Sequence, residues 1–570
     1  MMCEYAPNLP TLFLDRITQD PDRVCVRFRR SGVIEQRSWD DFAQDVFRAA
    51  AGLHRAGVQP GDRVAQLAEN RYEWIVADLA ILACQAVHVP IHSPLAPAQV
   101  AYQVTHSGAM TLLVSGSEQQ TKLRSIAEQL PAELQLITYE PPLAELTTHR
   151  THYWPEWLAS QDPASGRALA ESARQQQSPD ALATILYTSG TTGQPKGVML
   201  SQRNLVTNAT GTVNHFQMQA DEVRLCFLPL SHIFARCCDL YTWIVLGYQL
   251  DLATTRDSVL DDLQWSHPTV LSGVPYFFDR IYRVLRDHGK ADEPGALQAL
   301  LGGNIRYLCS GGAALPDHTY DYFHNQGVPV LQGYGLTETS PVISLSSKAC
   351  CRRGACGTCL ADVEVDTAAD GELITRGPHV MLGYWQDPLS TAAVLRDGWF
   401  HTGDLGHVDA DGFIFITGRK KELIVTAAGK NVAPVMLESL LTADPVIDQA
   451  LVIGDGRNYL TALLVPSWNA VREQLADLPA DAPIAGLCVR SDVRLLFERV
   501  VRDRLACVSY HEQVRKFTLL ERPFSLERQE ITPKLSLRRP VIAEHFQREI
   551  ELMYQTEAES AARTNFPTDD

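Results

Sequence analysis

Short apolar runs alternate with helix-like segments between residues 63 and 115, and this alternation constrains the fold more than any other feature of the sequence. Strands are predicted at 63–68, 87–91 and 110–115, with helices at 72–85 and from residue 97 onward. Strands that alternate with helices are typical of a parallel sheet whose two faces are covered by helices. The predicted fold class is therefore α/β.

The chain is longer than one hydrophobic core usually supports. It has 570 residues, and chains beyond about 250–300 residues generally divide into domains. The pattern changes after the run GRKK at 418–421, where predicted strands at 451–454 and 460–465 mix with predicted helices at 434–441 and 492–505. We expect a large N-terminal domain over residues 1–419 and a smaller α+β domain over residues 420–570.

Composition and charge limit the class of function. The chain is 45% hydrophobic and 21% charged, as is usual for folded globular proteins. Its 50 Lys and Arg residues against 67 Asp and Glu residues give a net charge of −17. Binding to nucleic acid is driven by basic residues that neutralise phosphates, so no nucleic-acid partner is expected. A local basic site for a small phosphate ligand stays compatible with this balance.

Three observations concern the location of the protein. The N-terminus has no basic start followed by an apolar run, so no secretory signal is predicted. The 13 cysteines lack the spacing of a disulfide framework, and we expect reduced thiols in a cytoplasmic protein. The best candidate for a membrane span, at 74–91, is interrupted by Asp78, Gln85 and His88 and is interpreted as a buried helix that leads into a strand. Peripheral contact with a membrane stays open.

A loop rich in glycine and hydroxyl residues carries the strongest chemical signal. It reads YTSGTTGQPKG at 187–197 and directly follows an apolar predicted strand at 182–186. Such a loop can turn backbone amides and hydroxyl groups toward one anion, and Lys196 can add a positive charge. Its spacing differs from that of a Walker A loop, and Pro195 disfavours a helix directly after it. We predict a phosphate-binding loop, with a polar turn as the alternative. The residues predicted to contact the phosphates are Thr188, Ser189, Gly190, Thr191, Thr192, Gly193 and Lys196.

This loop resembles the phosphate loop of the acyl-adenylate-forming superfamily, which includes acyl-CoA synthetases, luciferases and the adenylation domains of peptide synthetases. Other motifs similar to those of the family follow in the family's order, from about residue 35 to about residue 550. They are LPLSHIF at 228–234, SGGA at 310–313, QGYGLTET at 332–339, GWFHTGD at 398–404 and GRKK at 418–421. The longer runs GWFHTGDLG and GRKKELIVTAAGKNVAP are similar to those of long-chain fatty acyl-CoA synthetases. The resemblance implies that ATP and Mg2+ are used to activate a fatty acid as acyl-AMP, which is then transferred to CoA.

The resemblance also implies roles for residues of the nucleotide site. Tyr334, between two glycines, would offer a flat face to the adenine. Asp404 would accept hydrogen bonds from the ribose hydroxyls, with Arg419 as a charged donor nearby. Thr188 and Glu338 would hold Mg2+, which prefers hard oxygen ligands and stays bound to phosphate oxygens. The alternatives are turns at Tyr334 and Asp404 and a helix cap at Glu338. The other residues expected in the nucleotide site are Gly311, Gly312, Gly333, Gly335 and Thr337.

His232 lies in an otherwise apolar stretch, where a single histidine is usually a core residue. The resemblance instead implies a catalytic histidine at the junction of the acyl and CoA tunnels. Phe234 is a candidate for the acyl pocket. Tyr276, Phe277 and Phe278 are further candidates, with aromatic core packing as the alternative.

The resemblance implies that the C-terminal domain is a mobile lid, hinged at Lys420 and Lys421, that rotates between two half-reactions. Gly429 would then lie where the backbone lines the pantetheine tunnel. The family's catalytic lysine is replaced here by Ser536, within the run TPKLSLRR. Side chains two residues apart in an extended segment point to one face. We therefore expect Lys534 to supply the catalytic positive charge in this chain, with a surface lysine in a weakened or inactive enzyme as the alternative.

Four cysteines fall outside the family pattern: Cys350, Cys351, Cys356 and Cys359. Closely spaced thiols can bind zinc. Structural zinc sites, however, usually take ligand pairs from separated knuckles, so no zinc is expected.

Two other functions stay open from the sequence. A fatty acyl-AMP ligase that loads an acyl-carrier protein would share these motifs, and so would a degenerate regulatory homologue that only binds nucleotide. A luciferase-like monooxygenase has no support beyond the shared fold, and a fold alone does not determine function.

Overall fold

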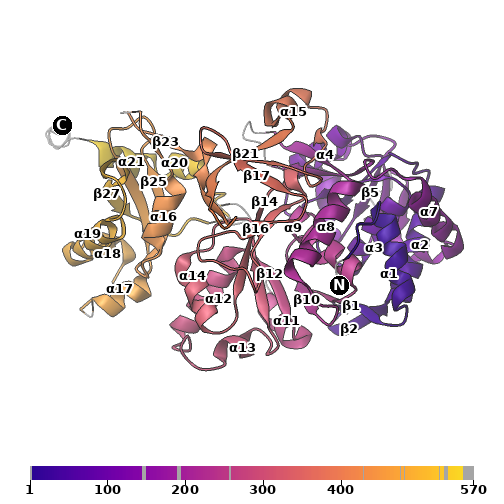
Figure 1. The fold of residues 1–570 in the computed structure, drawn as a ribbon, viewed down its shortest axis with the longest axis horizontal. Coiled ribbons are helices and arrows are strands. Elements are labelled where there is room, and N and C mark those ends of the chain that lie inside the picture. The colour runs from indigo at the N-terminus through magenta and orange to yellow at the C-terminus, as the bar shows by residue number, and fades with distance from the viewer. Residues whose placement is uncertain are drawn as a thin grey trace, which may run out of the picture.

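The structure is a computed structural model, and it describes residues 3–143, 149–188, 194–255, 258–427, 429–475, 477–479, 482–525, 527–531 and 537–555. Figure 1 shows a larger N-terminal part in which helices pack on β-sheets, and a smaller part formed by the C-terminal end of the chain. The predicted α/β class, with a smaller α+β part at the C-terminus, is confirmed.

The predicted alternation at 63–115 forms the centre of an eight-stranded sheet with the order β19-β9-β8-β4-β3-β5-β6-β7. Strand β3 (Arg63–Leu67) pairs in parallel with both β4 (Val87–Ile91) and β5 (Thr111–Val114). Helices α3 (Tyr72–Ala83) and α4 (Pro97–Ser107) connect these strands. The other strands are β6 (Gln135–Thr138), β7 (Thr151–Tyr153), β8 (Leu182–Thr188), β9 (Lys196–Ser201) and β19 (Gly383–Tyr384).

A nine-stranded sheet has the order β16-β15-β14-β13-β12-β10-β11-β1-β2. Its central pairs are parallel, and antiparallel strands lie at both ends. The strands are β1 (Val24–Arg30), β2 (Val33–Ser38), β10 (Val223–Cys226), β11 (Gln249–Leu252), β12 (Val270–Gly273), β13 (Tyr307–Ser310), β14 (Val330–Gly335), β15 (Val342–Leu345) and β16 (Thr358–Cys359).

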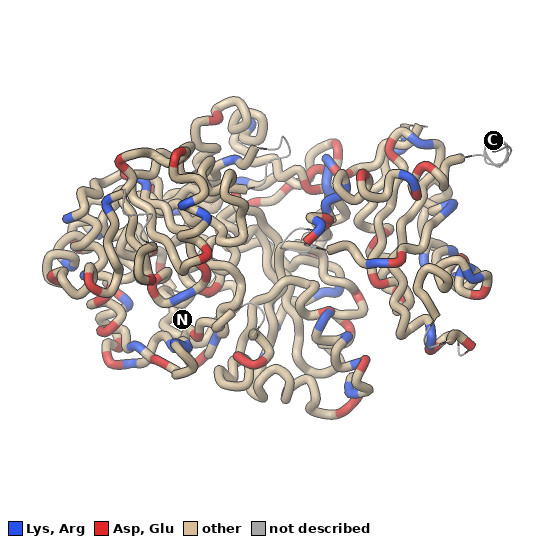
Figure 2. Tube along the Cα trace, turned by 180° about the vertical axis from the view of Figure 1, so that it is seen from behind, with Lys and Arg blue, Asp and Glu red and all other residues tan. Residues whose placement is uncertain are grey.

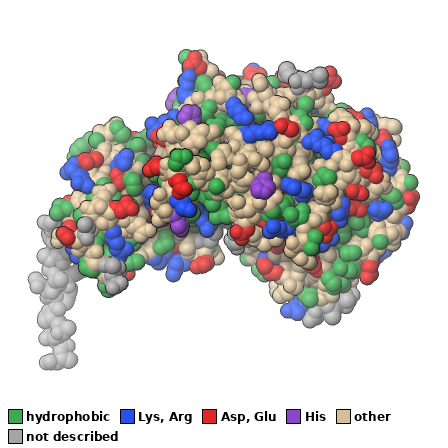
Figure 3. All heavy atoms as spheres, turned by 90° about the horizontal axis from the view of Figure 1, so that it is seen from below, with side chains coloured by type: hydrophobic (Ala, Val, Ile, Leu, Met, Phe, Trp, Pro, Cys, Tyr) green, Lys and Arg blue, Asp and Glu red, His purple; other side chains and the backbone are tan. Residues whose placement is uncertain are grey.

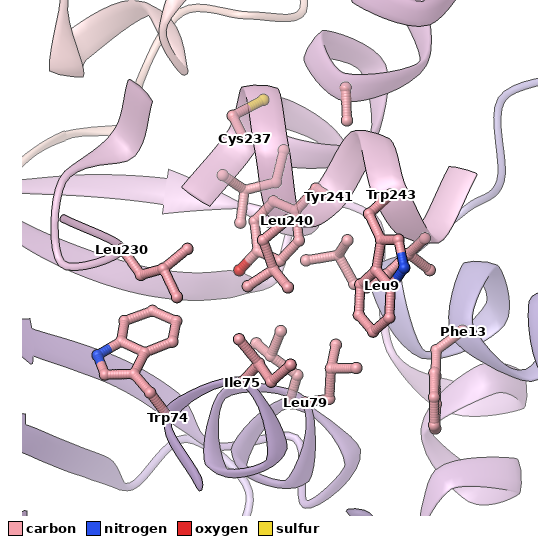
Figure 4. Close-up of a cluster of buried hydrophobic side chains, with 14 of the residues drawn as sticks. Leu9, Phe13, Trp74, Ile75, Leu79, Leu230, Cys237, Leu240, Tyr241 and Trp243 are labelled. Carbon is pink, nitrogen blue, oxygen red and sulfur yellow. The ribbon is translucent and has the colours of Figure 1, made fainter. Parts of the chain in front are cut away.

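The main hydrophobic core lies among the helices that pack on these sheets. Every residue of α3 is buried, and Figure 4 shows Trp74, Ile75 and Leu79 of α3 facing Leu240 and neighbouring apolar side chains. Other helices that contribute to this core include α1 (Leu9–Gln19), α2 (Trp39–Arg55), α6 (Trp154–Ala159), α7 (Pro163–Gln176), α8 (Gln202–Phe216) and α10 (Thr242–Leu246).

Two of the polar residues that interrupt the apolar stretch at 74–91 belong to a buried cluster. Oδ1 of Asp78 lies 2.6 Å from Nδ1 of His88 and 2.5 Å from Nη2 of Arg236. All three residues are fully buried, and the pairing of Asp78 with Arg236 reduces the cost of burying their charges. The interpretation of this stretch as a buried helix and strand is confirmed. None of the helices in the described part of the chain is long and apolar enough to cross a membrane.

A third sheet, in which all strand pairs are antiparallel, was not expected from the sequence. It has the order β17-β18-β21-β20, and β22 pairs with β21. Its strands are β17 (Glu364–Thr367), β18 (Glu372–Arg376), β20 (Leu395–Arg396), β21 (Trp399–Val408) and β22 (Ile414–Arg419). Helix α15 (Pro388–Val394) lies directly before β20.

The C-terminal part has hydrophobic clusters of its own, made only of residues from Ile424 onward. A short hairpin of β23 (Ile424–Val425) and β24 (Asn431–Val432) precedes a three-stranded sheet of β25 (Ile447–Ile453), β26 (Leu460–Pro466) and β27 (Val514–Leu519). Helices α16 (Pro434–Thr442) and α19 (Ser491–Arg504) confirm the helices predicted at 434–441 and 492–505.

Charged residues occur along both parts of the chain, whereas the central strands carry few of them (Figure 2). On the face seen in Figure 3, basic and acidic side chains are intermixed with small groups of hydrophobic side chains. This face therefore has no large area of a single charge.

Candidate active site

Strands β8 and β9 form a hairpin that carries the predicted phosphate-binding loop. Thr188 and Lys196 pair with each other across the hairpin, so both lie where the loop begins and ends. Lys196 begins a strand rather than a helix, which agrees with the preceding Pro195. The predicted contact residues Ser189, Gly190, Thr191, Thr192 and Gly193 lie outside the described residues.

Helix α4 contacts both ends of this loop. The Tyr102 hydroxyl donates a hydrogen bond of 3.2 Å to the carbonyl oxygen of Pro195, and Nδ1 of His106 lies 2.8 Å from the hydroxyl oxygen of Tyr187. The rings of Tyr102 and His106 stack, with their centroids 5.0 Å apart. Burial lowers the pKa of His106, which favours its neutral form. These contacts hold the ends of the loop on α4, and sequence reasoning missed them because the two segments are far apart in the chain.

Lys196 and Glu338 both contact Tyr384 of β19. The Lys196 ammonium lies 5.0 Å from the centroid of the Tyr384 ring and donates a hydrogen bond of 2.6 Å to Oγ of Ser390. The Tyr384 hydroxyl donates a hydrogen bond of 2.9 Å to Oε1 of Glu338. An ammonium group and a carboxylate are thus brought to one aromatic side chain next to the phosphate hairpin. Tyr384 and Ser390 were missed, and the only local signal was a Gly-Tyr pair, which is common in turns.

Glu338 lies in a single helical turn, Thr337–Thr339. The hydroxyl of Thr339 accepts a hydrogen bond of 2.9 Å from the amide of Leu336, the residue that precedes the turn, so Thr339 provides the capping contact. The carboxylate of Glu338 binds Tyr384 instead, which argues against the helix-cap alternative.

The donor set around Glu338 fits Mg2+ bound together with a nucleotide. Within the described ranges, no group of three or more His, Cys, Asp and Glu side chains could hold a metal ion. Magnesium is commonly held by one or two carboxylates together with substrate phosphates. A partly buried carboxylate near the phosphate loop meets this requirement, with Thr188 as a possible hydroxyl ligand at the loop.

Tyr334, Asp404 and Arg419 form a hydrogen-bonded group. The Tyr334 hydroxyl donates a 2.8 Å hydrogen bond to Oδ2 of Asp404, and Nε of Arg419 lies 2.9 Å from Oδ1. Asp404 and Arg419 face each other in the antiparallel pairing of β21 and β22. Burial raises the pKa of Asp404, and the charge of Arg419 opposes this shift. The structure therefore brings together three residues that were predicted for one nucleotide site.

The glycines of the predicted adenine segments have different structural environments. A side chain at Gly335 would place its Cβ 1.7 Å from the carbonyl oxygen of Pro341, so packing against β15 requires glycine there. A Cβ at Gly311 would lie 3.3 Å from the ring of Phe234, which brings this segment beside the histidine motif. Gly312 has a positive φ of 86° and open space around it. Gly333 is in ordinary contact with Leu345.

His232 is only partly buried, which argues against a core histidine. Its Nδ1 accepts a hydrogen bond of 3.3 Å from the backbone amide of Phe234. The side chain of Asn70 holds the same motif: it donates to the carbonyl oxygen of Leu228 at 2.7 Å and accepts from the amide of Leu230 at 2.8 Å. The backbone of the LPLSHIF motif is thus held in place from the loop between β3 and α3.

The three aromatic candidates for the acyl pocket, on α12 (Pro275–Asp287), differ in exposure. Phe278 is fully buried and packs edge-on against Phe323, with the ring centroids 6.0 Å apart. This agrees with the core-packing alternative. The ring of Phe277 packs against that of Phe227, with the two centroids 4.7 Å apart. Tyr276 is 49% exposed, so it is not a core residue.

The expected hinge follows directly after β22. Lys420 forms ion pairs with Glu372 of β18, a strand of the same sheet, and with Asp370 in the turn before β18. Gly429 has a positive φ of 69° and no neighbouring atom that a Cβ would meet. Lys534 and Ser536 lie outside the described residues.

Of the four cysteines outside the family pattern, Cys356 and Cys359 both lie against Ser344 of β15. Burial raises the pKa of Cys356 to about 12 and that of Cys359 to about 11, so both thiols are protonated at neutral pH. Sγ of Cys351 lies 3.3 Å from the hydroxyl of Tyr320. A Cβ at Gly357 would clash with the backbone of Leu345, so the turn after Cys356 is a packing feature.

Comparison with known proteins places this geometry in a family. Residues 13–385 match the family described as AMP-binding enzyme, and residues 421–558 match the AMP-binding enzyme C-terminal domain. Long-chain-fatty-acid–CoA ligase FadD15 of Mycobacterium bovis is 33% identical to this chain, with 96% of this chain and 97% of that protein covered. The protein of the same name from Mycobacterium tuberculosis has the same identity and coverage.

A solved structure shows the same fold. The anthranilate CoA ligase AuaEII in complex with anthranoyl-AMP has a TM-score of 0.77 and 17% identity, with 95% of this chain and 98% of that chain covered. Together with the matches over both parts of the sequence, these findings show that the chain belongs to the AMP-binding enzyme family.

Proposed function

We propose that this chain is an AMP-forming ligase that activates a long-chain fatty acid as acyl-AMP and transfers the acyl group to CoA. The arrangement of Lys196, Tyr384 and Glu338 beside the phosphate hairpin carries this proposal. It provides a positive charge for the phosphates of a nucleoside triphosphate and a negative charge for the metal ion bound to them. The substrate class is supported by the names of relatives that are 33% identical over nearly the whole chain.

The first half-reaction joins two anions. A carboxylate oxygen of the fatty acid attacks the α-phosphorus of ATP, an acyl–phosphate bond forms, and pyrophosphate leaves. Positive charge and preorganised donors are needed here, with little work for a general base. Lys196 would offset phosphate charge, and the loop residues 188–193 would donate to phosphate oxygens. Mg2+, held by Glu338 and Thr188, would neutralise part of the phosphate charge when bound.

The nucleoside would be held by the residues around Asp404. This carboxylate would accept hydrogen bonds from the ribose hydroxyls, with Arg419 beside it, while the ring of Tyr334 would lie against the adenine. The buried position of Asp404 strengthens such hydrogen bonds, because the local dielectric is low. The other residues proposed for this site are Gly311, Gly312, Gly333, Gly335 and Thr337.

In the second half-reaction the sulfur of CoA attacks the acyl-AMP carbonyl, a thioester bond forms and AMP leaves. We assign His232 to the junction of the acyl and CoA paths and Gly429 to the pantetheine path. The C-terminal domain, residues 420–570, would rotate about Lys420 and Lys421 between the two steps. The separate family matches to residues 13–385 and 421–558 support a boundary near this point.

The acceptor and the location of the protein belong to the same proposal. CoA is the proposed acceptor, and an acyl-carrier protein is the alternative. A cytoplasmic location is the expectation, and peripheral contact with a membrane stays open.

A panel of fatty acids of increasing chain length tests this function. The full-length protein is supplied with ATP, Mg2+ and either CoA or an acyl-carrier protein, and the release of AMP is followed. We expect AMP release that requires both a long-chain fatty acid and CoA. If AMP is released only when the acyl-carrier protein is supplied, the protein is the carrier-loading ligase and not a CoA ligase. The proposal would be contradicted if the protein binds nucleotide but shows neither AMP release nor fatty-acid-dependent pyrophosphate exchange.

A further inference from the structure

Tyr384 lies beside the phosphate hairpin because β19 adds to the edge of β9. The two strands are antiparallel, with Tyr384 opposite Val198. Two backbone hydrogen bonds flank this pair: the amide of Trp385 donates to the carbonyl oxygen of Gly197 at 2.7 Å, and the amide of Leu382 donates to that of Met199 at 2.9 Å. The position of Tyr384 is therefore set by the sheet and not by a free loop.

The side chain of Tyr384 contacts two groups of opposite charge through different parts of its ring. The face of the ring lies 5.0 Å from the Lys196 ammonium, a distance typical of cation–π contacts. The hydroxyl donates a 2.9 Å hydrogen bond to Oε1 of Glu338. The backbone reinforces this contact, because the amide of Met381 donates to the carbonyl oxygen of Glu338 at 2.9 Å. Glu338 is thus held by both its backbone and its side chain.

The hydroxyl of Tyr384 acts as a neutral donor. The residue is 8% exposed, and its hydroxyl donates its hydrogen bond to the Glu338 carboxylate. A protonated hydroxyl gives the carboxylate one fixed hydrogen bond and takes no proton from it. A ligand carboxylate held by such a partner needs less ordering when a metal binds.

We propose that Tyr384 is a positioning residue that aligns Glu338 and Lys196 as one unit for the metal-bound phosphates of ATP. The inference rests on the proposed function of the site and adds a residue to it. Ser390 completes the arrangement, because its hydroxyl accepts a 2.6 Å hydrogen bond from Lys196 and so orients the ammonium group from a second direction. The competing explanation is that Tyr384 only fills space between β9 and α15.

Tyr384→Phe separates these explanations, because it removes the hydroxyl and keeps the ring. ATP binding to the full-length protein is measured by titration calorimetry over a range of Mg2+ concentrations, without fatty acid. We expect the Mg2+ concentration for half-maximal ATP binding to rise about tenfold, as is usual when the partner of a metal-ligating group is removed. At saturating Mg2+ the ATP affinity should return to that of the wild type. An unchanged Mg2+ dependence would overturn the proposal.

Tyr384→Leu removes the ring as well. Because the cation–π contact with Lys196 is then also lost, we expect ATP affinity to stay reduced at saturating Mg2+. A matched control is Tyr322→Phe, which deletes a hydroxyl bonded to the carbonyl oxygen of Ala291 away from the site. This control should bind ATP and Mg2+ as the wild type does, and melting temperatures of all variants establish that they are folded.

A double-mutant cycle shows whether Tyr384 acts through Glu338. Residues that work through one another have non-additive effects. In a Glu338→Gln background, Tyr384→Phe should therefore change the Mg2+ dependence of ATP binding by less than twofold. Additive effects would show that Tyr384 acts independently of Glu338, against the proposal.

The outcomes also separate this inference from the proposed function. If no fatty acid is activated but Tyr384→Phe still shifts the Mg2+ dependence, the substrate assignment fails and the role of Tyr384 stands. If fatty acids are activated and the shift is absent, only the role of Tyr384 fails.

Discussion

The hydroxyl of Tyr334 donates a 2.8 Å hydrogen bond to Oδ2 of Asp404, and Arg419 engages the other oxygen of the same carboxylate. Asp404 is only 2% exposed, so its partners determine how it is charged and oriented. The three residues come from β14, β21 and β22, which are separate in the chain. This group places a buried carboxyl group beside an aromatic ring.

Asp404→Asn should weaken ATP binding. The amide keeps the shape of the carboxylate but removes its charge and one acceptor oxygen. Hydrogen bonds to charged groups contribute about 1.5–3 kcal/mol, so we expect the ATP dissociation constant to rise about 10- to 100-fold. Titration calorimetry with ATP and Mg2+ measures this change. Tyr334→Phe, which keeps the ring, should have a smaller effect, and wild-type affinity in Asp404→Asn would remove Asp404 from the nucleotide site.

Lys534→Ala should separate the two half-reactions. Loss of the positive charge should lower fatty-acid-dependent pyrophosphate exchange on the order of a hundredfold, the scale seen when one stabilising donor is removed from a transition state. Thioester formation from supplied acyl-AMP and CoA should stay largely intact. Ser536→Ala is the matched control and should change neither rate. If Lys534→Ala exchanges pyrophosphate normally, Arg538 becomes the next cation to test.

Lys421→Pro tests the hinge. Proline fixes φ, so it should block rotation of the backbone while the adenylation arrangement stays available. We expect acyl-AMP formation to continue and thioester formation to be lost, as followed by single-turnover assays with labelled fatty acid. Lys421→Ala removes the side chain without restricting the backbone and should lose much less thioester formation. Equal loss of both half-reactions in a folded Lys421→Pro variant would contradict the hinge assignment.

His379 should make the stability of the protein depend on pH. The residue is 1% exposed, and burial lowers the pKa of its imidazole from 6.5 to about 4. The native state therefore favours the neutral ring, so this contribution to the free energy of unfolding is complete above pH 6.5 and is lost as the pH falls toward 4. The loss at pH 5 should be about 2 kcal/mol.

Melting temperatures of the wild type and of His379→Gln, measured at pH 7 and pH 5, test this prediction. Glutamine does not titrate in this range and can keep a hydrogen bond with Thr375, which now lies 3.0 Å from Nε2 of His379. The variant should therefore lose less stability than the wild type on acidification. An identical shift in both proteins would show that His379 is not responsible.

The sequence by itself predicted the features that depend on local order. The strands and helices at 63–115 followed from the alternation of apolar runs and turn residues, because the spacing of apolar residues indicates which side chains are buried. The absence of a helix directly after the phosphate loop followed from Pro195, because proline disturbs a hydrogen-bonded helix. The family and its motifs were also readable, since each motif is a short continuous run.

Only the tertiary structure decided which side chains meet. Tyr384 reaches Glu338 across 46 residues, and Ser390 reaches Lys196 across 194 residues, because β19 pairs with the far edge of β9. The same holds for Asn70, which holds the backbone of the LPLSHIF motif from 158 to 160 residues away. Hydrogen bonds between distant segments depend on which strands become neighbours, and the periodicity of a local segment predicts only the type of element. The local pattern therefore determined the elements, and the pairing of strands determined the composition of the site.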